Sequence, residues 1–284
     1  MSAERRIERT AQGAGRWFPG HRGELLKMVD RFLDEATPPP LPGRIVSLIA
    51  PHAGYLYSGA VAGFAYRAAR DNASTAGKPD VAVVLGFGHR ESFHGVALMD
   101  GSSFATPLGS VALDTDTAVE LMASDPRITL DYRPHSGEHS AENQVPFLQA
   151  ALPATPLVLG LIGSHEPSLL EGLAAALGKL AKKKKVLVIA SSDMLHDPDY
   201  ERVRTTDQDT LRQVASLDIT GVMREWEYDR QIFCGLAPVV TAMTFARQQG
   251  CSRGTVLRYR NSGDDHPESR GQWVVGYGAI AFTV

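Results

Sequence analysis

The 284-residue sequence is poor in cysteine, in long apolar runs and in excess charge of either sign. Two cysteines, Cys234 and Cys251, are too few for a disulfide framework in a chain of this length, so each is expected to be a free thiol. No apolar run reaches the roughly 18 residues that a membrane-spanning helix needs. The formal net charge of -3 gives no general attraction to nucleic acid. We therefore expect no nucleic-acid partner and no membrane association.

Several familiar sequence signals are also missing. The opening residues, MSAERRIERTAQGAG, lack the apolar core of a secretion signal, which predicts a cytoplasmic location. The chain has no GxxxxGKS/T, no HExxH and no GxSxG motif. Gly86 and Gly88 follow an apolar run but lack the third glycine of a dinucleotide fingerprint. We expect no nucleotide cofactor.

The sequence does contain short apolar runs that alternate with helical patterns. Apolar runs of this kind, without polar alternation, are typical of strands buried on both faces. Strands are expected over residues 45–50, 81–86, 157–162 and 186–190, and helices over 24–36, 58–70, 116–123, 142–152, 167–181, 201–215 and 236–249. A hairpin insert is expected from 96–99 and 111–113, and edge strands from 255–260 and 274–283. The alternation predicts one α/β domain over residues 1–284, with helices on both faces of a largely parallel or mixed sheet.

Polar residues follow three of the predicted strands. His52 comes after the first, His89 after the second, and Asp193 and His196 after the fourth. Ligands of open α/β sheets bind outside the carboxyl ends of the strands. Any one of these histidines has an equally simple explanation as a satisfied polar residue at a strand end. Their repetition favours a site, because imidazole is a common metal ligand and a base near pH 7.

Two further residues remain open candidates. His139 lies in SGEHSAENQVPFLQ, just before a predicted helix. Ser140 as N-cap and Glu142 in the first turn explain this motif without a site. Cys234 precedes the helix predicted over 236–249, where a helix dipole stabilises a thiolate. A lone cysteine is also commonly a small buried apolar residue.

Taken in order, these motifs resemble the Memo family, which includes the bacterial and archaeal group called AmmeMemoRadiSam system protein B. The resemblance covers most of the chain. It rests on AGRWFP (14–19), PHAGYLYSG (51–59), LGFGH (85–89), EHSAENQVPFLQ (138–149), SSDMLH (191–196), Cys234-Gly235, YRNSGD (259–264) and VVGYGA (274–279).

That family is similar to the class III extradiol dioxygenases of the LigB type, so the resemblance implies a three-layer αβα sandwich and a non-haem metal site. It places His52 and His89 at the two histidine ligand positions, and Cys234 where the dioxygenases have a carboxylate. Fe(II) is the expected metal. A thiolate makes the site softer, so copper and zinc are alternatives.

The resemblance also implies roles for other residues. His196 falls at the acid–base position with Asp193 orienting it, and His139 lines the same pocket. Three functions follow: a dioxygenase acting on a small aromatic substrate, a peptide-binding module with Tyr55 and Trp17 as contacts, or a metal- and redox-handling protein. The group name implies AMMECR1-like and radical-SAM protein partners.

Overall fold

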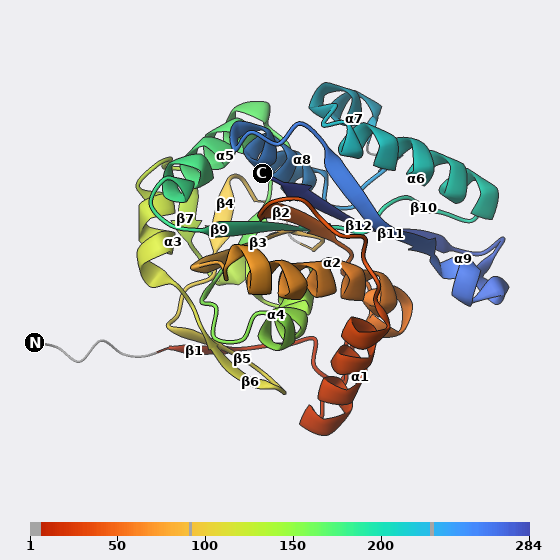
Figure 1. The fold of residues 1–284 in the computed structure, drawn as a ribbon, viewed down its shortest axis with the longest axis horizontal. Helices are drawn as coiled ribbons and strands as arrows, with labels where there is room; N and C mark the ends of the chain where they lie inside the picture. Colours follow the sequence, from red (N-terminus) through yellow and green to blue (C-terminus); the bar gives the residue numbers. More distant parts are fainter. Residues whose placement is uncertain (1–6, 91–92, 228–229) are drawn as a thin grey trace, which may run out of the picture.

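A mixed central sheet crosses the molecule, with helices on both faces (Figure 1). The structure is a computed structural model that describes residues 7–90, 93–227 and 230–284. The strand order is β10 (His196–Asp197), β12 (Val274–Thr283), β2 (Ile45–Ala50), β9 (Val186–Ser191), β3 (Val81–Phe87), β8 (Leu157–Ile162), β4 (Val96–Leu98) and β7 (Ile128–Leu130). β11 (Gly254–Asn261) also pairs with β12. The α/β class predicted from the sequence is confirmed.

The centre of the sheet is parallel and buried on both sides. β2, β9, β3 and β8 run in the same direction, whereas β12 is antiparallel to β2 and β4 is antiparallel to β8. Successive residues of a strand point to opposite faces. Along β3, Val81 and Val83 therefore join one apolar core, while Ala82 and Val84 join the other. Burial on both faces explains why these strands read as unbroken apolar runs.

The helices form the two outer layers (Figure 1). One core packs the sheet against α3 (Thr115–Met122), α5 (Pro167–Ala181), α6 (Tyr200–Ala215), α7 (Ile219–Glu225) and α8 (Leu236–Gln248). The other packs it against α1 (Arg22–Glu35), α2 (Tyr55–Ala76) and α4 (Val145–Ala151). A separate small sheet consists of β1 (Glu8–Thr10), β5 (Ser103–Thr106) and β6 (Gly109–Ala112), and a short helix, α9 (Ser262–Asp265), follows β11. Among the described residues, no helix is both long and apolar enough to cross a membrane.

Two details of the predicted topology are wrong. The segments expected to form a hairpin separate instead: β4 pairs with β8 and β7 in the central sheet, whereas β6 pairs with β5 in the small sheet. β12 was expected at an edge but lies between β2 and β11. Its residues are almost all buried, which fits an interior strand better than an edge.

The helix predicted over 142–152 begins later than expected. Residues 142–144 form a 3₁₀ turn, and the α-helix runs only from Val145 to Ala151. Pro146 has no backbone N–H, so it fits the first turn of a helix and disfavours a helix that starts much earlier. The 3₁₀ turn leaves Glu142, Asn143 and Gln144 buried, and the side chains of the last two donate to the carbonyls of His52 and Pro51, just after β2.

Candidate metal centre

His52, His89 and Asp193 each lie two residues beyond the end of a parallel strand, β2, β3 and β9 respectively. Because the three strands are neighbours, their ends meet at one edge of the sheet. Cys234 reaches the same edge two residues before α8 begins. One donor atom each from His52, His89 and Cys234 lies within 4.8 Å of the other two. The structure therefore brings together the three residues identified as candidate ligands.

Glu138 holds His89 in place. Its buried carboxylate accepts hydrogen bonds from Nδ1 of His89 at 3.0 Å and from the backbone N–H of His89 at 2.7 Å. The backbone N–H groups of His139 and Ser140 donate to it at 2.8 Å each. An ionised carboxylate only accepts, so the His89 ring carries its proton on Nδ1 and has Nε2 available for a ligand. Carboxylate–histidine pairs of this kind support many metal sites.

Glu138 is a functional candidate that the sequence reasoning missed, although the motif containing it was singled out. The one available signal was its position next to His139 in a motif that precedes a predicted helix. Burial raises the pKa of Glu138, but hydrogen bonds from His139 and His89 outweigh it and hold the pKa well below its usual range. The carboxylate is therefore ionised at neutral pH.

The histidines and the thiol stabilise each other's charged forms when no metal is bound. Burial lowers the pKa of His52, but the Cys234 thiolate and the Asp193 carboxylate outweigh it and raise the pKa. Burial also opposes the shift of His89, whose pKa rises to about 10 through its bonds to Cys234 and Glu138. Burial raises the pKa of Cys234, yet the two histidines bring it well below its ordinary range. A thiolate is the form of cysteine that binds metals.

Asp193 supports His52 rather than His196. Its Oδ1 accepts hydrogen bonds from the backbone N–H groups of His52 at 2.8 Å and of Ala53 at 3.2 Å. Nδ1 of His196 instead lies 2.9 Å from the carbonyl oxygen of Met194. The expectation that Asp193 orients the His196 ring is therefore wrong. The physical reason is that the turn after β9 directs the carboxylate toward the neighbouring strand end.

A cavity of about 720 Å³ opens over the three candidate ligands. Trp17, His139, His196 and Trp273 also line it. The rings of Trp17 and His139 stack with their centroids 3.9 Å apart and their planes 7° apart. Nδ1 of His139 lies 3.3 Å from the carboxylate of Glu138, so His139 contacts the same glutamate that holds His89. Burial lowers the pKa of His139 and outweighs its bond to Glu138.

Tyr55 lies outside the cavity. Its hydroxyl donates a hydrogen bond to the carbonyl of Asn143 at 2.7 Å, and its ring packs against Phe18 and Phe147. It is buried as the first residue of α2. This placement does not support the prediction that Tyr55 contacts a ligand in the cavity. Trp17, the other predicted contact, does lie in the cavity wall.

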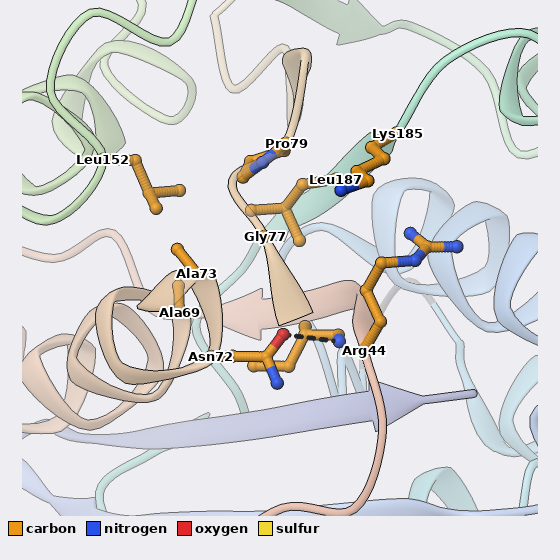
Figure 2. Close-up of a pocket in the computed structure, with 10 residues that line it drawn as sticks. Arg44, Ala69, Asn72, Ala73, Gly77, Pro79, Leu152, Lys185 and Leu187 are labelled. Atoms are coloured by element: carbon orange, nitrogen blue, oxygen red, sulfur yellow. Dashed lines mark hydrogen bonds between the residues drawn. The ribbon is translucent and has the colours of Figure 1, made fainter. Parts of the chain in front are cut away.

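A second pocket lies at the opposite, amino-terminal edge of the sheet (Figure 2). Its volume is about 20 Å³, which is room for about one water molecule. The side chain of Asn72 points into it and accepts a hydrogen bond from the backbone N–H of Ile45 at 2.9 Å. Asn72 also donates to the carbonyl of Gly43, so it joins α2 to the start of β2. The polar side chain in this pocket therefore serves to join two elements of the fold.

Comparison with known proteins identifies the family of this chain. A family model described as "Memo-like protein" matches residues 9–281, and the chain belongs to that family. A MEMO1 family protein of Methanopyrus kandleri is 30% identical and aligns over 97% of this chain and 99% of its own. A MEMO1 family protein of Sulfolobus acidocaldarius is 34% identical, over 95% of this chain and 97% of its own. The crystal structure of an uncharacterized protein from Escherichia coli K12 aligns with 83% of this chain and 99% of its own. It is 14% identical with a TM-score of 0.49, and this likeness is too weak to support an argument.

Proposed function

We propose that the chain binds a transition-metal ion through Nε2 of His52, Nε2 of His89 and Sγ of Cys234. The observation that carries this proposal is the approach of three donor atoms to within 4.8 Å of one another at one edge of the sheet. Two imidazoles and one thiolate suit iron, copper and zinc, so the donor set alone does not select the ion. Iron(II) is the ion to test first, and copper and zinc are the alternatives.

The metal content of the purified protein tests this proposal. Protein purified without oxygen is loaded with Fe(II), Cu(I) or Zn(II), desalted and measured by elemental analysis. We expect about one ion per chain, with a large loss in His52→Ala and in Cys234→Ser. His94→Ala changes an exposed histidine and Cys251→Ser changes the other cysteine, so both serve as controls. Binding that is indifferent to His52 and Cys234 would contradict the proposed ligand set.

The reaction class that fits this pocket is oxidation of a small aromatic diol by dioxygen. Iron(II) held by these three residues would leave coordination positions open and would pass electrons from the diol, which is the reductant, to dioxygen. The protein supplies a proton acceptor: His196 donates from Nδ1 to the carbonyl of Met194, which leaves Nε2 with a lone pair. Trp17 and Trp273 give the cavity flat apolar walls that suit an aromatic ring.

Oxygen uptake with a panel of catechols tests the reaction separately from metal binding. We expect wild-type protein loaded with iron to consume oxygen and to change the absorbance of at least one catechol. His196→Ala should keep the metal and lose most of the turnover, because general acid–base catalysis typically contributes about 10²–10⁴-fold. Stoichiometric iron with no catechol turnover would instead favour a metal- and redox-handling function.

A partner-binding function is the second candidate. Trp273 lines the cavity although 57% of its surface is exposed, and exposed tryptophans are enriched at binding surfaces. The ligand would be a peptide segment of a partner, with AMMECR1-like and radical-SAM proteins as the partners to test. Peptide affinity that survives removal of the metal and falls in Trp273→Ala would support this function. Affinity that disappears with the metal would oppose it.

A further inference from the structure

The ring of His52 has a second hydrogen-bonding partner on the side away from Cys234. Its Nδ1 lies 3.1 Å from Oγ of Ser191, the last residue of β9. Both side chains are buried. Which of the two atoms donates decides the tautomer of the imidazole, and the other partners of Ser191 answer that question.

The hydroxyl proton of Ser191 is already used. Oγ of Ser191 donates to the carbonyl oxygen of Ser140. A carbonyl only accepts, and a hydroxyl has a single proton, so this contact fixes the direction in which Ser191 donates. The oxygen is left with two lone pairs and no proton for His52.

Gln144 takes one of those lone pairs. Its Nε2 lies 2.7 Å from Oγ of Ser191 and 2.9 Å from the carbonyl oxygen of Pro51. The carbonyl of Pro51 requires a donor, so the amide nitrogen must face this side. On the other side, the hydroxyl of Tyr66 donates to Oε1 of Gln144 at 2.7 Å. Three buried side chains thus form a chain in which every donor has an acceptor.

From this geometry we infer that Ser191 is a positioning residue, held by Gln144 and Tyr66, which keeps the neutral ring of His52 protonated on Nδ1. The remaining lone pair of Ser191 Oγ accepts that proton. Nε2 of His52 then carries the lone pair that faces Sγ of Cys234 at 3.2 Å. The opposite tautomer would set the lone pairs of Nδ1 and Oγ against each other in a buried site, at the cost of an unmade hydrogen bond.

The inference rests on the proposed function in one respect, because Nε2 is the atom proposed to bind the metal. A ring whose Nδ1 proton is already held needs no change of tautomer when the ion enters, and a charged ring has only to release its Nε2 proton. Glu138 does the same for His89 with a carboxylate. For His52, whose ring is fully buried, a neutral hydroxyl performs this task without adding another buried charge.

The tautomer can be measured without any metal. Protein with ¹⁵N-labelled histidine is prepared in a Cys234→Ala background, which prevents metal binding and removes the competing sulfur. ¹⁵N NMR spectra are followed through a pH titration until the His52 ring is neutral. We expect the proton on Nδ1 in this background. Adding Ser191→Ala should move a large part of the population to the Nε2–H tautomer.

Two further variants complete the test. Ser191→Cys keeps a side chain of similar size with a weak acceptor, and it should shift the tautomer as well if the alanine variant folds poorly. Ser47→Ala removes a fully buried hydroxyl from β2 that has no hydrogen-bond partner among the described residues, so it should leave the tautomer unchanged. An Nδ1–H ring that persists in both Ser191 variants would overturn the inference.

Metal affinity in the otherwise native chain provides the second readout. Ser191→Ala should bind metal about 10–100-fold more weakly than Ser47→Ala, in line with other residues that orient a metal-binding histidine. Equal affinities in these two variants would overturn the positioning role. Failure of the wild-type protein to bind any metal would overturn the proposed function instead, and the NMR result would still decide the tautomer.

Discussion

Nε2 of His52 lies 3.2 Å from Sγ of Cys234, although the two residues are 182 positions apart in the sequence. The contact forms because β2 ends and α8 begins at the same edge of the sheet. Ligand atoms bound to one tetrahedral zinc ion at about 2.0–2.3 Å stand roughly 3.5 Å apart. The observed separation therefore needs little adjustment to accept an ion between the two atoms.

Loss of the Glu138 charge should weaken metal binding without removing a ligand. Glu138→Gln keeps the size of the side chain but replaces one acceptor oxygen with an NH₂ donor. That donor would face N–H groups, such as those of His89, which now donate to the carboxylate. We expect the metal affinity to fall about 10–100-fold. Competition with a chelator of known affinity measures the change.

A surface pair provides the control for Glu138. Glu268 lies 3.4 Å from Nδ1 of His266, and its side chain is exposed. Glu268→Gln therefore alters a glutamate–histidine contact away from the proposed ligands and should leave metal affinity unchanged. Equal affinities for Glu138→Gln and Glu268→Gln would show that the buried carboxylate does not support the ligand.

Gly86 allows the segment containing Glu138 to pack against β3. A Cβ atom at Gly86 would lie 2.5 Å from Oγ of Ser140 and 2.9 Å from the backbone nitrogen of Ala141. Gly86→Ala should therefore lower the free energy of unfolding by about 1–3 kcal/mol, as overpacking commonly does. It should weaken metal binding as well, because the displaced segment carries Glu138.

Gly23 is the matched control for this substitution. It lies in α1, where a Cβ atom would have no described heavy atom outside its own helix and chain neighbours within 4 Å. Gly23→Ala should raise the free energy of unfolding by about 0.5–1 kcal/mol, because alanine loses less conformational freedom in a helix than glycine. Denaturant titrations of both variants give opposite signs if the packing argument holds. Equal effects would contradict it.

The main strands could be predicted from the sequence, and so could the meeting of the three candidate ligands, whereas the contacts that hold these residues could not. Unbroken apolar runs mark β2, β3 and β9, and the polar residue that follows each run marks its carboxyl end. Glu138 pairs with His89 although the two residues are 49 positions apart, because the segment that contains Glu138 packs against the end of β3. The family resemblance implied that Asp193 would orient His196, but the local turn directs its carboxylate to the backbone of His52. Such contacts depend on tertiary geometry, which local patterns do not encode.

Asp207 should make the protein less stable as the pH rises. Burial raises its pKa to about 7, and the hydrogen bonds from Tyr259 and Leu195 only partly offset this. Between about pH 4 and 7 the folded protein therefore holds a proton that the unfolded chain has lost. Linkage then requires the contribution of this group to the free energy of unfolding to be highest below about pH 4, to fall as the pH rises to about 7, and to level off above that.

Asp207→Asn should remove this dependence. The amide cannot ionise, so the variant should gain on the order of 4 kcal/mol relative to wild type at pH 8 and roughly 1–2 kcal/mol at pH 5. Asp209→Asn changes an exposed aspartate in the same helix and should show no such difference between the two pH values. Denaturant titrations at both pH values decide the matter. A difference between variant and wild type that is the same at pH 5 and pH 8 would contradict the assignment.

Cys234 should react with iodoacetamide faster than Cys251 when no metal is bound. The pKa of Cys234 lies well below its ordinary range, and the residue faces the open cavity. Burial raises the pKa of Cys251 to about 11, so its reactive thiolate is scarce at pH 7. We expect a rate difference of at least roughly tenfold at pH 7. Mass spectrometry of digested samples taken over time measures both sites in one experiment.

Two changes of condition separate the cause of this reactivity from simple exposure. His52→Ala removes the charge that most lowers the pKa of Cys234, so alkylation at pH 7 should slow even though the cavity becomes larger. Metal loading should protect Cys234, because a thiolate bound to an ion is a weaker nucleophile and is covered by it. Faster alkylation in His52→Ala would mean that access, and not charge, limits the reaction. Unchanged alkylation after stoichiometric metal loading would mean that the ion binds without the thiolate, and His52 and His89 would then need a different third ligand.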